Sequence, residues 1–494
     1  MREIMEELLK KHGHSDFYPV QRKFIEHVEK QGYQRNFIIS APTTSGKTLI
    51  AEALIEKLAR STRNALILYV APTISLLNEK KKDFQRKLSP NIKICRSLRE
   101  VDLNRPNLLL LTPEVLFETL KSDPASLAQV SLAIIDEIHL LASRSRGLEL
   151  DITLTFLKGI FPELQFVLMS ATIAFGKQMV EWLDADIIED RSRTAKLDIE
   201  IRISKRTRIE DILEIAENAI KEQKIVAIFR RTKPDVHSLA RALLQCGVIP
   251  EISDEVKQKI RNGLDRLKID NKSHIDYELE EFYLKGIGIH HADIRSKYKD
   301  FCEAMVTRGY IPIVICTTTL GLGINLPIDI AVISEPRLGQ NSMTPSTFIQ
   351  ISGRAGRSGF SRYGKSIMFV SKQREQEYWE EVRDGKVPLD LPVSIRNRKP
   401  REITEYVLRL VNTEFFKTWD NIKELESNLF STFVSGNHRK IKIDVPSYSP
   451  GLSSKVSRSL NNDVFDVIGN QLFDYNLVTE TEKGLQLTDL GRLA

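Results

Sequence analysis

FIISAPTTSGKT, residues 37–48, places a short apolar run directly before a loop of small residues that ends in Gly46, Lys47 and Thr48. The apolar run 37–39 predicts a buried strand, and residues 48–58 (TLIAEALIEKL) predict a helix with apolar side chains on one face. Backbone N–H groups of such a loop and of the helix N-terminus suit phosphate oxygens. The stretch therefore predicts an ATP-binding loop between a strand and a helix of an α/β fold.

The polar residues of this loop have separate predicted roles. Lys47 would neutralise the β- and γ-phosphates of ATP, and the Thr48 hydroxyl would bind Mg²⁺. Ala41 stands where the general pattern has its first glycine. The other loop residues that we expect to contact the nucleotide are Thr43, Thr44, Ser45 and Gly46.

Length and composition predict about three globular domains, since the chain has 494 residues, of which 41% are hydrophobic and 28% charged. No apolar run approaches the roughly 20 residues that a membrane helix needs. The first residues, MREIMEELLKKHGH, lack the apolar core of a secretory signal. We therefore expect a cytoplasmic protein with no membrane partner. The net charge of +6 is compatible with a polyanionic partner but also fits an ordinary solvated surface.

The four cysteines contain no CxxC pair, which argues against a zinc cluster and against a disulfide framework. We expect them to be buried thiols: Cys95, Cys246, Cys302 and Cys316.

An aromatic turn upstream of the loop is a candidate for binding adenine. Residues 17–21 (FYPVQ) lead into a predicted helix at 23–30. The amide of Gln21 offers a donor and an acceptor that suit the adenine edge, and the Phe17 ring could stack on the base. Plain surface packing of the same residues remains the alternative.

Two further predicted strands, 65–70 and 107–111, end in Thr-Pro elements. The carboxyl ends of strands carry the ligand sites of open parallel sheets. Each element alone also fits a plain turn. The candidate contacts for the backbone of an extended ligand are Pro72, Thr73, Thr112 and Pro113.

A strand predicted at 132–135 delivers two adjacent carboxylates, Asp136 and Glu137, at its tip. Asp136 would hold Mg²⁺, and Glu137 would orient or deprotonate the attacking water. Such a pair can also be a capping turn. Its position less than a hundred residues after a phosphate loop favours the catalytic interpretation.

A charged segment at 191–208 (RSRTAKLDIEIRISKRTR) predicts a hinge between two sheets. A second α/β domain would follow, with charged helices and a mobile surface at 251–281. The pair His290 and His291 has no third ligand nearby in sequence, so we do not expect a metal there. The strands expected in this domain are 225–229, 286–289, 311–316 and 364–370.

The segment QISGRAGR, residues 350–357, carries two arginines one helical turn apart, Arg354 and Arg357. Placed opposite Lys47 across a cleft, they would neutralise charge developing on the γ-phosphate. Gln350 would position the water beside Glu137. The alternative is an exposed basic turn, or one that binds nucleic-acid phosphate directly.

These motifs together resemble those of superfamily 2 helicases of the DExH type, in particular the Ski-two-like group, which includes archaeal repair helicases and eukaryotic RNA-remodelling helicases. The resemblance implies two tandem RecA-like P-loop domains followed by a small, mostly helical winged-helix domain, with ATP and Mg²⁺ as cofactors. The segments that carry it are DEIH (136–139), RGLE (146–149), SAT (170–172), GIGIHHADI (286–294), TTTLGLGINLP (317–327) and QISGRAGR.

The same resemblance implies roles for single residues. Gly323 would lie against the nucleotide. Three residues would couple the state of ATP to the grip on nucleic acid: His139, Ser170 and Thr172. Three others would contact the nucleic acid: Arg231, His291 and Thr318.

The domains expected on this basis are 1–195, 196–388 and 389–494, the last with helices at 402–410 and 463–472 and two short strands within 477–494. Residues 335–344 (EPRLGQNSMT) lie where relatives have a strand-separating hairpin, with a turn expected near 339–341. Relatives continue beyond the point that corresponds to Ala494 into a helical ratchet domain. We expect either a longer protein or a partner chain that supplies this function.

Three functions remain open. The first is a helicase that couples ATP hydrolysis to 3′-to-5′ movement on single-stranded or tailed DNA or RNA. The second is a translocase without unwinding, the motor of a nuclease-containing defence or repair complex. The third is a regulatory ATP switch subunit, which the full motif set disfavours.

Overall fold

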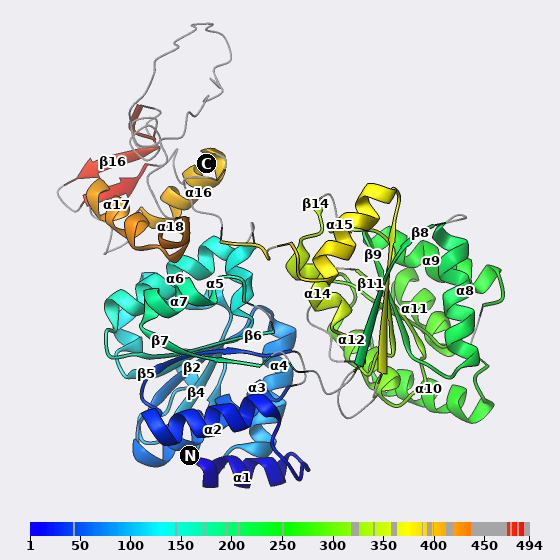
Figure 1. Ribbon diagram of the computed structural model, residues 1–494, viewed down its shortest axis with the longest axis horizontal. Coiled ribbons are helices and arrows are strands. Elements are labelled where there is room, and N and C mark those ends of the chain that lie inside the picture. The colour runs from blue at the N-terminus through cyan, green and yellow to red at the C-terminus, as the bar shows by residue number, and fades with distance from the viewer. Residues whose placement is uncertain are drawn as a thin grey trace, which may run out of the picture.

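Two separate parallel β-sheets, each between layers of helices, carry most of the chain in this computed structural model (Figure 1). The residues that the structure describes are 1–42, 45–143, 146–171, 173–190, 192, 196–204, 208–248, 251–317, 326–338, 341–356, 363–387, 389–392, 398, 400–411, 418–435, 472–474, 477–481 and 484–488.

The first sheet has seven strands in the order β3-β4-β2-β5-β6-β1-β7, and all of their pairings are parallel. The strands β2 and β4 are buried along their whole length and are almost entirely apolar, as expected for a sheet covered on both faces. The strands are β1 (Asn36–Ser40), β2 (Leu66–Val70), β3 (Lys93–Cys95), β4 (Asn107–Leu111), β5 (Val130–Ile135), β6 (Gln165–Ser170) and β7 (Ala185–Glu189).

Helices cover both faces of this sheet (Figure 1). They are α1 (Arg2–Lys11), α2 (Pro19–Gln31), α3 (Lys47–Ser61), α4 (Ile74–Lys87), α5 (Pro113–Ser122), α6 (Gly147–Ile160) and α7 (Gly176–Leu183), with 3₁₀ turns η1 (Leu98–Glu100), η2 (Pro124–Leu127) and η3 (Ile138–Ala142). The core on one face is continuous with the third domain, as described below.

The second sheet has six parallel strands in the order β10-β11-β9-β12-β15-β8. They are β8 (Lys196–Ile203), β9 (Val226–Arg230), β10 (Ile287–His290), β11 (Ile313–Thr317), β12 (Ile330–Ile333) and β15 (Tyr363–Val370). The helices are α8 (Arg208–Lys221), α9 (Lys233–Gln245), α10 (Asp254–Arg266), α11 (His274–Leu284), α12 (Ser296–Thr307), α14 (Pro345–Ser352) and α15 (Gln373–Arg383).

The prediction of a hinge over 191–208 is wrong for residues 196–203, which form β8 and pair with β15 along eight residues. In KLDIEIRI, apolar and charged residues alternate, and Ile201 is buried in the core of the second domain. Such alternation is typical of an edge strand with one buried face. The charged positions hid a strand that the pattern supports.

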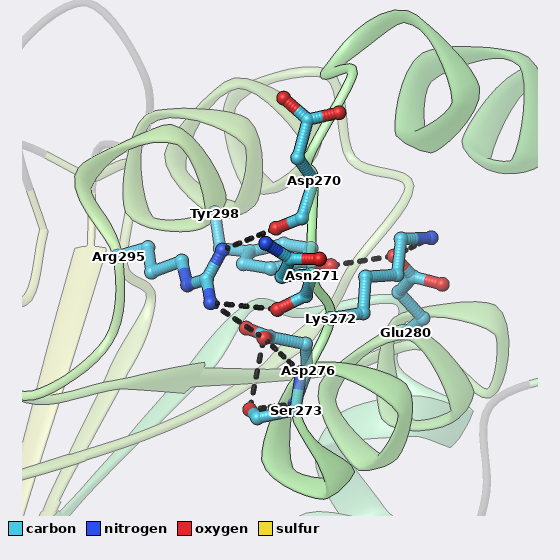
Figure 2. Close-up of polar contacts among 8 residues, drawn as sticks. All are labelled: Asp270, Asn271, Lys272, Ser273, Asp276, Glu280, Arg295 and Tyr298. Carbon is cyan, nitrogen blue, oxygen red and sulfur yellow. Dashed lines mark hydrogen bonds and ion pairs between the residues drawn. The ribbon is translucent and has the colours of Figure 1, made fainter.

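The charged stretch 251–281 forms helices α10 and α11, as predicted, and polar contacts fix the connection between them (Figure 2). The Arg295 guanidinium donates to the carbonyl oxygens of Asp270 and Asn271 at 3.2 and 3.1 Å. The Glu280 carboxylate pairs with Lys272 at 2.7 Å and accepts from the Tyr298 hydroxyl at 2.5 Å. The connection between α10 and α11 is therefore held by an ion pair of its own and by polar side chains from the start of α12.

A short antiparallel pair, β13 (Arg337–Leu338) and β14 (Asn341–Ser342), confirms the hairpin predicted within 335–344. The close of its turn, at 339 and 340, lies outside the described residues.

The third domain comprises α16 (Pro400–Leu410), α17 (Trp419–Asn428), α18 (Phe430–Ser435) and an antiparallel pair, β16 (Val478–Thr481) with β17 (Gly484–Leu487). It packs on the first domain, where the Phe430 ring lies 5.4 Å from the rings of both Phe175 and Trp182. The buried Asp151 carboxylate of α6 accepts from the backbone N–H groups of Phe430 and Ser431 at 2.7 and 3.0 Å. The helix predicted at 463–472 falls almost entirely outside the described residues.

The predicted fold class, two tandem RecA-like α/β domains followed by a small, mostly helical domain, is confirmed. Among the described residues, no helix combines the length and the apolar character needed to cross a membrane. Three of the cysteines are buried as predicted, whereas Cys246 is exposed at the end of α9.

Candidate active site

The predicted phosphate loop lies between β1 and α3, at the carboxyl edge of the first sheet. Gly46 has a φ of +80°, and a Cβ there would lie 2.1 Å from Nε2 of Gln21, so only glycine fits. The Lys47 ammonium donates to the carbonyl oxygens of Ala41 and Pro42 at 2.5 and 2.9 Å. Among the described residues, no side chain caps the start of α3. Its first N–H groups are therefore suited to an anionic ligand.

Neighbouring residues brace this loop. The Ser45 hydroxyl donates to the Pro42 carbonyl at 2.7 Å. The buried Gln21 amide donates to the Gly46 carbonyl at 2.9 Å and accepts from the Tyr18 backbone at 3.0 Å. Gln21 thus connects the start of α2 to the phosphate loop. Its contact with adenine stays a prediction, as does stacking of the half-buried Phe17 ring on the base. Thr43 and Thr44 lie outside the described residues.

The acidic pair follows β5, as predicted, and its backbone is unusual. Glu137 has a φ of +57°, in the left-handed region that a non-glycine residue adopts at a cost. This turn directs the Asp136 carboxylate toward the Tyr69 hydroxyl of β2, which donates to it at 2.6 Å. The Glu137 carboxylate lies 3.1 Å from Nδ1 of His139.

The two carboxyl groups have opposite pKa shifts. Burial raises the pKa of Asp136, and the charge of Glu137 adds to this shift. Burial alone would also raise the pKa of Glu137, but the hydrogen bond and charge of His139, with the charges of Lys47 and Arg354, lower it to about 2. Glu137 is therefore ionised throughout the neutral range, as a group that orients or activates water must be.

Two of the residues expected to couple ATP to nucleic acid are brought together. Nδ1 of His139 lies 3.1 Å from the Ser170 hydroxyl at the end of β6. The acidic turn is thereby connected to the segment that follows β6. Thr172 lies outside the described residues.

The second domain directs Arg354 toward this constellation. Arg354 follows α14 and is only 8% exposed. Burial lowers its pKa, and the charges of Glu137 and Glu79 in the first domain oppose that shift. Gln350, 7% exposed, has a buried Nε2 that forms no hydrogen bond to the described residues. Arg357, Thr318 and Gly323 lie outside the part of the chain that the structure describes.

Two glycines fix the position of this arginine segment. A Cβ on Gly356 would lie 2.6 Å from the backbone nitrogen of Gly364 in β15, and Gly356 has a φ of +70°. A Cβ on Gly364 would meet the backbone of Ala355 at 2.4 Å. The segment that follows α14 therefore lies directly against the amino end of β15, which fixes the backbone next to Arg354.

The Thr-Pro elements lie at the same edge of the first sheet, where Thr73 and Thr112 cap α4 and α5. Arg146, whose contacts were not predicted, joins them. Its guanidinium donates to the Pro72 carbonyl and pairs with Glu114 at 2.6 Å. Pro113 is the first residue of α5. Pro72 and Thr73 are partly exposed, whereas Thr112 and Pro113 are buried. We call the sheet edge that carries Pro72, Thr73 and Arg146 the strand face.

In the second domain, two residues predicted to contact nucleic acid are described: Arg231 is partly exposed and His291 is buried. Arg231 and Arg208 both approach the Glu335 carboxylate, at 4.0 and 3.9 Å. His291 is buried, and its Nε2 lies 2.9 Å from Nε2 of His237. Burial and the charge of His237 lower the pKa of His291 to about 4. A direct contact of His291 with nucleic acid would require it to leave this pair.

Two side chains near the phosphate loop were missed. Tyr69 positions Asp136, and the Lys80 ammonium of α4 donates to the Thr48 hydroxyl at 2.8 Å. Tyr69 lies within an apolar strand and Lys80 within the run EKKKD, so the sequence carried no local signal of either contact.

Oxygen donors for Mg²⁺ are present, because the Thr48 hydroxyl and the Asp136 carboxylate face the same space as Lys47 and Lys80. Hydroxyl and carboxylate oxygens are the protein ligands that Mg²⁺ prefers. A cationic nitrogen already lies on the hydroxyl, which shows that the site accepts positive charge. Among the described residues, no group of three or more His, Cys, Asp or Glu side chains is placed to hold a metal.

Two family patterns match the chain. The pattern described as DEAD/DEAH box helicase matches residues 18–180, which include the phosphate loop and the acidic pair. The pattern described as Helicase conserved C-terminal domain matches residues 268–359, which include Arg354. The matches therefore fall on the two sides of the site just described.

Several curated relatives carry the name ATP-dependent DNA helicase Hel308. That of Thermoplasma acidophilum is 28% identical over 73% of this chain and 53% of its own length. That of Methanococcus vannielii is 28% identical over 87% of this chain and 61% of its own, and that of Methanocella arvoryzae is 24% identical over 97% and 65%. The chain thus spans between about half and two thirds of the length of these relatives.

Proposed function

Because this chain belongs to the DExH-type helicases of superfamily 2, within the Ski-two-like group, we propose that it is an ATP-hydrolysing motor that moves 3′ to 5′ along one strand of DNA and displaces the other. The observation that carries this proposal is that Arg354 of the second domain is buried and that its charge and that of Glu137 in the first domain shift each other's pKa. ATP hydrolysis then depends on how the two domains meet, as conversion of chemical energy into movement requires.

In this mechanism the loop and the N-terminus of α3 bind the phosphates, and Lys47 exchanges its loop carbonyls for phosphate oxygens. Glu137, ionised and held by His139, orients the attacking water. The Gln350 amide, whose buried Nε2 forms no hydrogen bond to the described residues, is available to assist it. Arg354, together with Arg357, stabilises the charge that develops on the γ-phosphate. Mg²⁺, held by Thr48 and Asp136, would neutralise phosphate charge.

Nucleic acid would lie on the strand face and on the basic residues of the second domain, Arg208 and Arg231. Contacts through helix N-termini and arginines address phosphates, so binding should be nearly independent of sequence and weakened by salt. The names of the relatives favour DNA over RNA. We place this motor in the cytoplasm, whose reducing conditions suit its free thiols.

Side-by-side ATPase assays with single-stranded DNA and with RNA of equal length test the substrate. We expect DNA to stimulate hydrolysis at least tenfold more, and equal or greater stimulation by RNA would contradict the DNA assignment. Strand displacement is then measured on duplexes with a 3′ or a 5′ tail. Only the 3′-tailed duplex should be unwound, and Lys47→Ala should abolish both reactions.

A translocase without unwinding is the second candidate, favoured by one observation. The hairpin β13–β14 pairs only two residues on each side, Arg337 with Ser342 and Leu338 with Asn341. A wedge this short is a small barrier to a duplex. ATP hydrolysis and movement on single-stranded DNA, with no displacement from a 3′-tailed duplex, would establish this alternative and would fit a motor subunit that acts with a nuclease or another partner chain.

A further inference from the structure

Lys80 reaches the metal-binding side of the nucleotide site from an element outside the loop. It lies on α4, and its ammonium donates to the Thr48 hydroxyl at 2.8 Å. Its charge also acts on Asp136, where it lowers the carboxyl pKa, and on Lys47. Lys80 therefore lies within electrostatic reach of both side chains that would hold Mg²⁺.

The strand β2 and the helix α4 that follows it each supply one side chain that donates a hydrogen bond to a predicted Mg²⁺ ligand. Tyr69 of β2 donates its hydroxyl proton to Asp136 at 2.6 Å, and Lys80 of α4 donates to Thr48. Tyr69 is fully buried, so its hydroxyl is held in a fixed position beside Asp136. One β–α unit thus fixes the positions of a hydroxyl from α3 and a carboxylate from β5.

Lys80 supplies the positive charge that this group of oxygens needs. Two carboxylates, Asp136 and Glu137, converge beside the loop, while the Lys47 ammonium is held by the carbonyl oxygens of Ala41 and Pro42. Like charges at close range in a partly dehydrated site repel strongly. An ammonium near Asp136 and Thr48 offsets that repulsion.

An ammonium group and a divalent cation both bind a hydroxyl group through the lone pairs of its oxygen. Mg²⁺ requires a near-octahedral shell of oxygens at 2.0–2.1 Å. A second cation donating to the same hydroxyl from 2.8 Å would both block that shell and repel the ion. The contact in the structure and metal binding by Thr48 are therefore mutually exclusive.

On the basis of the proposed function, we propose that Lys80 is an internal counter-ion of the nucleotide site, which holds Thr48 in place, offsets the charge of Asp136 and competes with the divalent cation for these oxygens. Lys80 is a positioning residue in this account. Lys80 would have to leave Thr48 before that hydroxyl could hold a divalent cation.

Binding of Mn²⁺ tests this competition without reference to turnover. The free Mn²⁺ concentration is followed by electron paramagnetic resonance during titration of the full chain in the presence of ADP. Lys80→Met should bind Mn²⁺ about tenfold more tightly than the original protein, because a competing charge is removed. Lys80→Arg, which keeps a cation, should not. Lys82→Met, an exposed lysine on the same helix, should leave the affinity unchanged.

Thermal unfolding gives a second measurement. Without divalent cation, Lys80→Met should melt several degrees below the original protein, whereas saturating Mg²⁺ and ADP should remove most of that difference. Unchanged or weaker Mn²⁺ binding by a folded Lys80→Met protein, or a melting deficit that Mg²⁺ and ADP leave intact, would overturn the inference. If the original protein hydrolyses no ATP although Lys80→Met binds Mn²⁺ more tightly, the proposed function fails and the counter-ion role stands.

Discussion

In each α/β domain one helix follows directly after a strand, α3 after β1 and α9 after β9, but the N-termini of these two helices are capped differently. In the first domain, β1 leads through Gly46 into α3, and among the described residues no side chain caps that helix. In the second, β9 leads through Thr232 into α9, where Thr232 and Asp235 form a capping box. The N–H of Asp235 is thus bonded to a side chain, whereas its counterpart in α3, the N–H of Leu49, donates to the backbone carbonyl of Gly46 at 3.1 Å.

A third helix start shows another solution. The first N–H groups of α18 are satisfied by Asp151, a carboxylate from α6 in the first domain. The start of α3 (the open start) is the predicted nucleotide site, the start of α9 (the self-capped start) is closed by its own side chains, and the start of α18 attaches the third domain to the first.

Loss of the lysine at the open start should have the largest effect. Lys47→Ala should reduce ATP hydrolysis at least about 100-fold, since it removes a charge that stabilises the developing phosphate charge. Steady-state ATPase assays measure this. Lys233, the first residue of α9, is the matched control. Lys233→Ala should retain most activity, and a comparable loss in both variants would remove the distinction between the two starts.

The capping carboxylate from α6 should make attachment of the third domain depend on pH. Burial raises the pKa of Asp151 to about 6, against hydrogen bonds from Ser431 and Phe430 and the charge of Arg398. The folded chain thus binds this proton more tightly than the unfolded chain does. The stabilisation is complete below about pH 4 and is lost as pH rises toward 6.

The difference in unfolding free energy between the original protein and Asp151→Asn isolates this effect from other titrating groups. As pH rises from 4 to 6, the original protein should lose up to about 3 kcal/mol of stability relative to Asp151→Asn. Above pH 7 the difference between the two proteins should no longer change with pH. Denaturant unfolding at fixed pH values measures it. A pH-independent difference would show that burial does not govern the Asp151 carboxyl.

A methyl group at the open start should cost more than the same group at a helix end elsewhere. Gly46→Ala adds a Cβ at a φ of +80° and against Gln21, whereas Gly247→Ala adds one at a φ of +72° with nothing within 4 Å. The backbone cost is common to both, about 1 kcal/mol. We expect Gly46→Ala to lose about 2 kcal/mol more, from overpacking, in denaturant unfolding. It should also weaken ADP binding, and equal stability of the two variants would contradict the close contact with Gln21.

The smallest expected effect concerns the self-capped start. Thr232→Ala should lower the free energy of unfolding by about 1 kcal/mol through loss of the cap, with ATPase activity largely kept. Thr48→Ala should show the reverse, little loss of stability and a large loss of activity. An ATPase defect in Thr232→Ala comparable to that of Thr48→Ala would mean that α9 also binds a ligand.

The parts of the site that follow from local pattern were predictable. The strand–loop–helix that begins at residues 37–48 and the acidic pair after β5 are each a short continuous segment of sequence. Parallel strand topology then brings both segments to one edge of the sheet. Tyr69 and Lys80 could not be predicted, because their contacts join residues 67 and 32 positions apart through side chains with no motif. The strand β8 was missed for the opposite reason, since its charged face obscured a regular alternation.

The short connection between the two sheets affects how tightly the second domain, which carries Arg354, must bind to the first. Only six residues separate β7, at the edge of the first sheet, from β8, at the edge of the second. At about 3.5 Å per residue, this tether limits separation to a few tens of ångströms. Arg354 is therefore presented to the phosphate loop at an effective concentration on the order of millimolar. In the proposed mechanism, a weak intrinsic affinity would therefore suffice for closure of the two domains and would permit rapid reopening after hydrolysis.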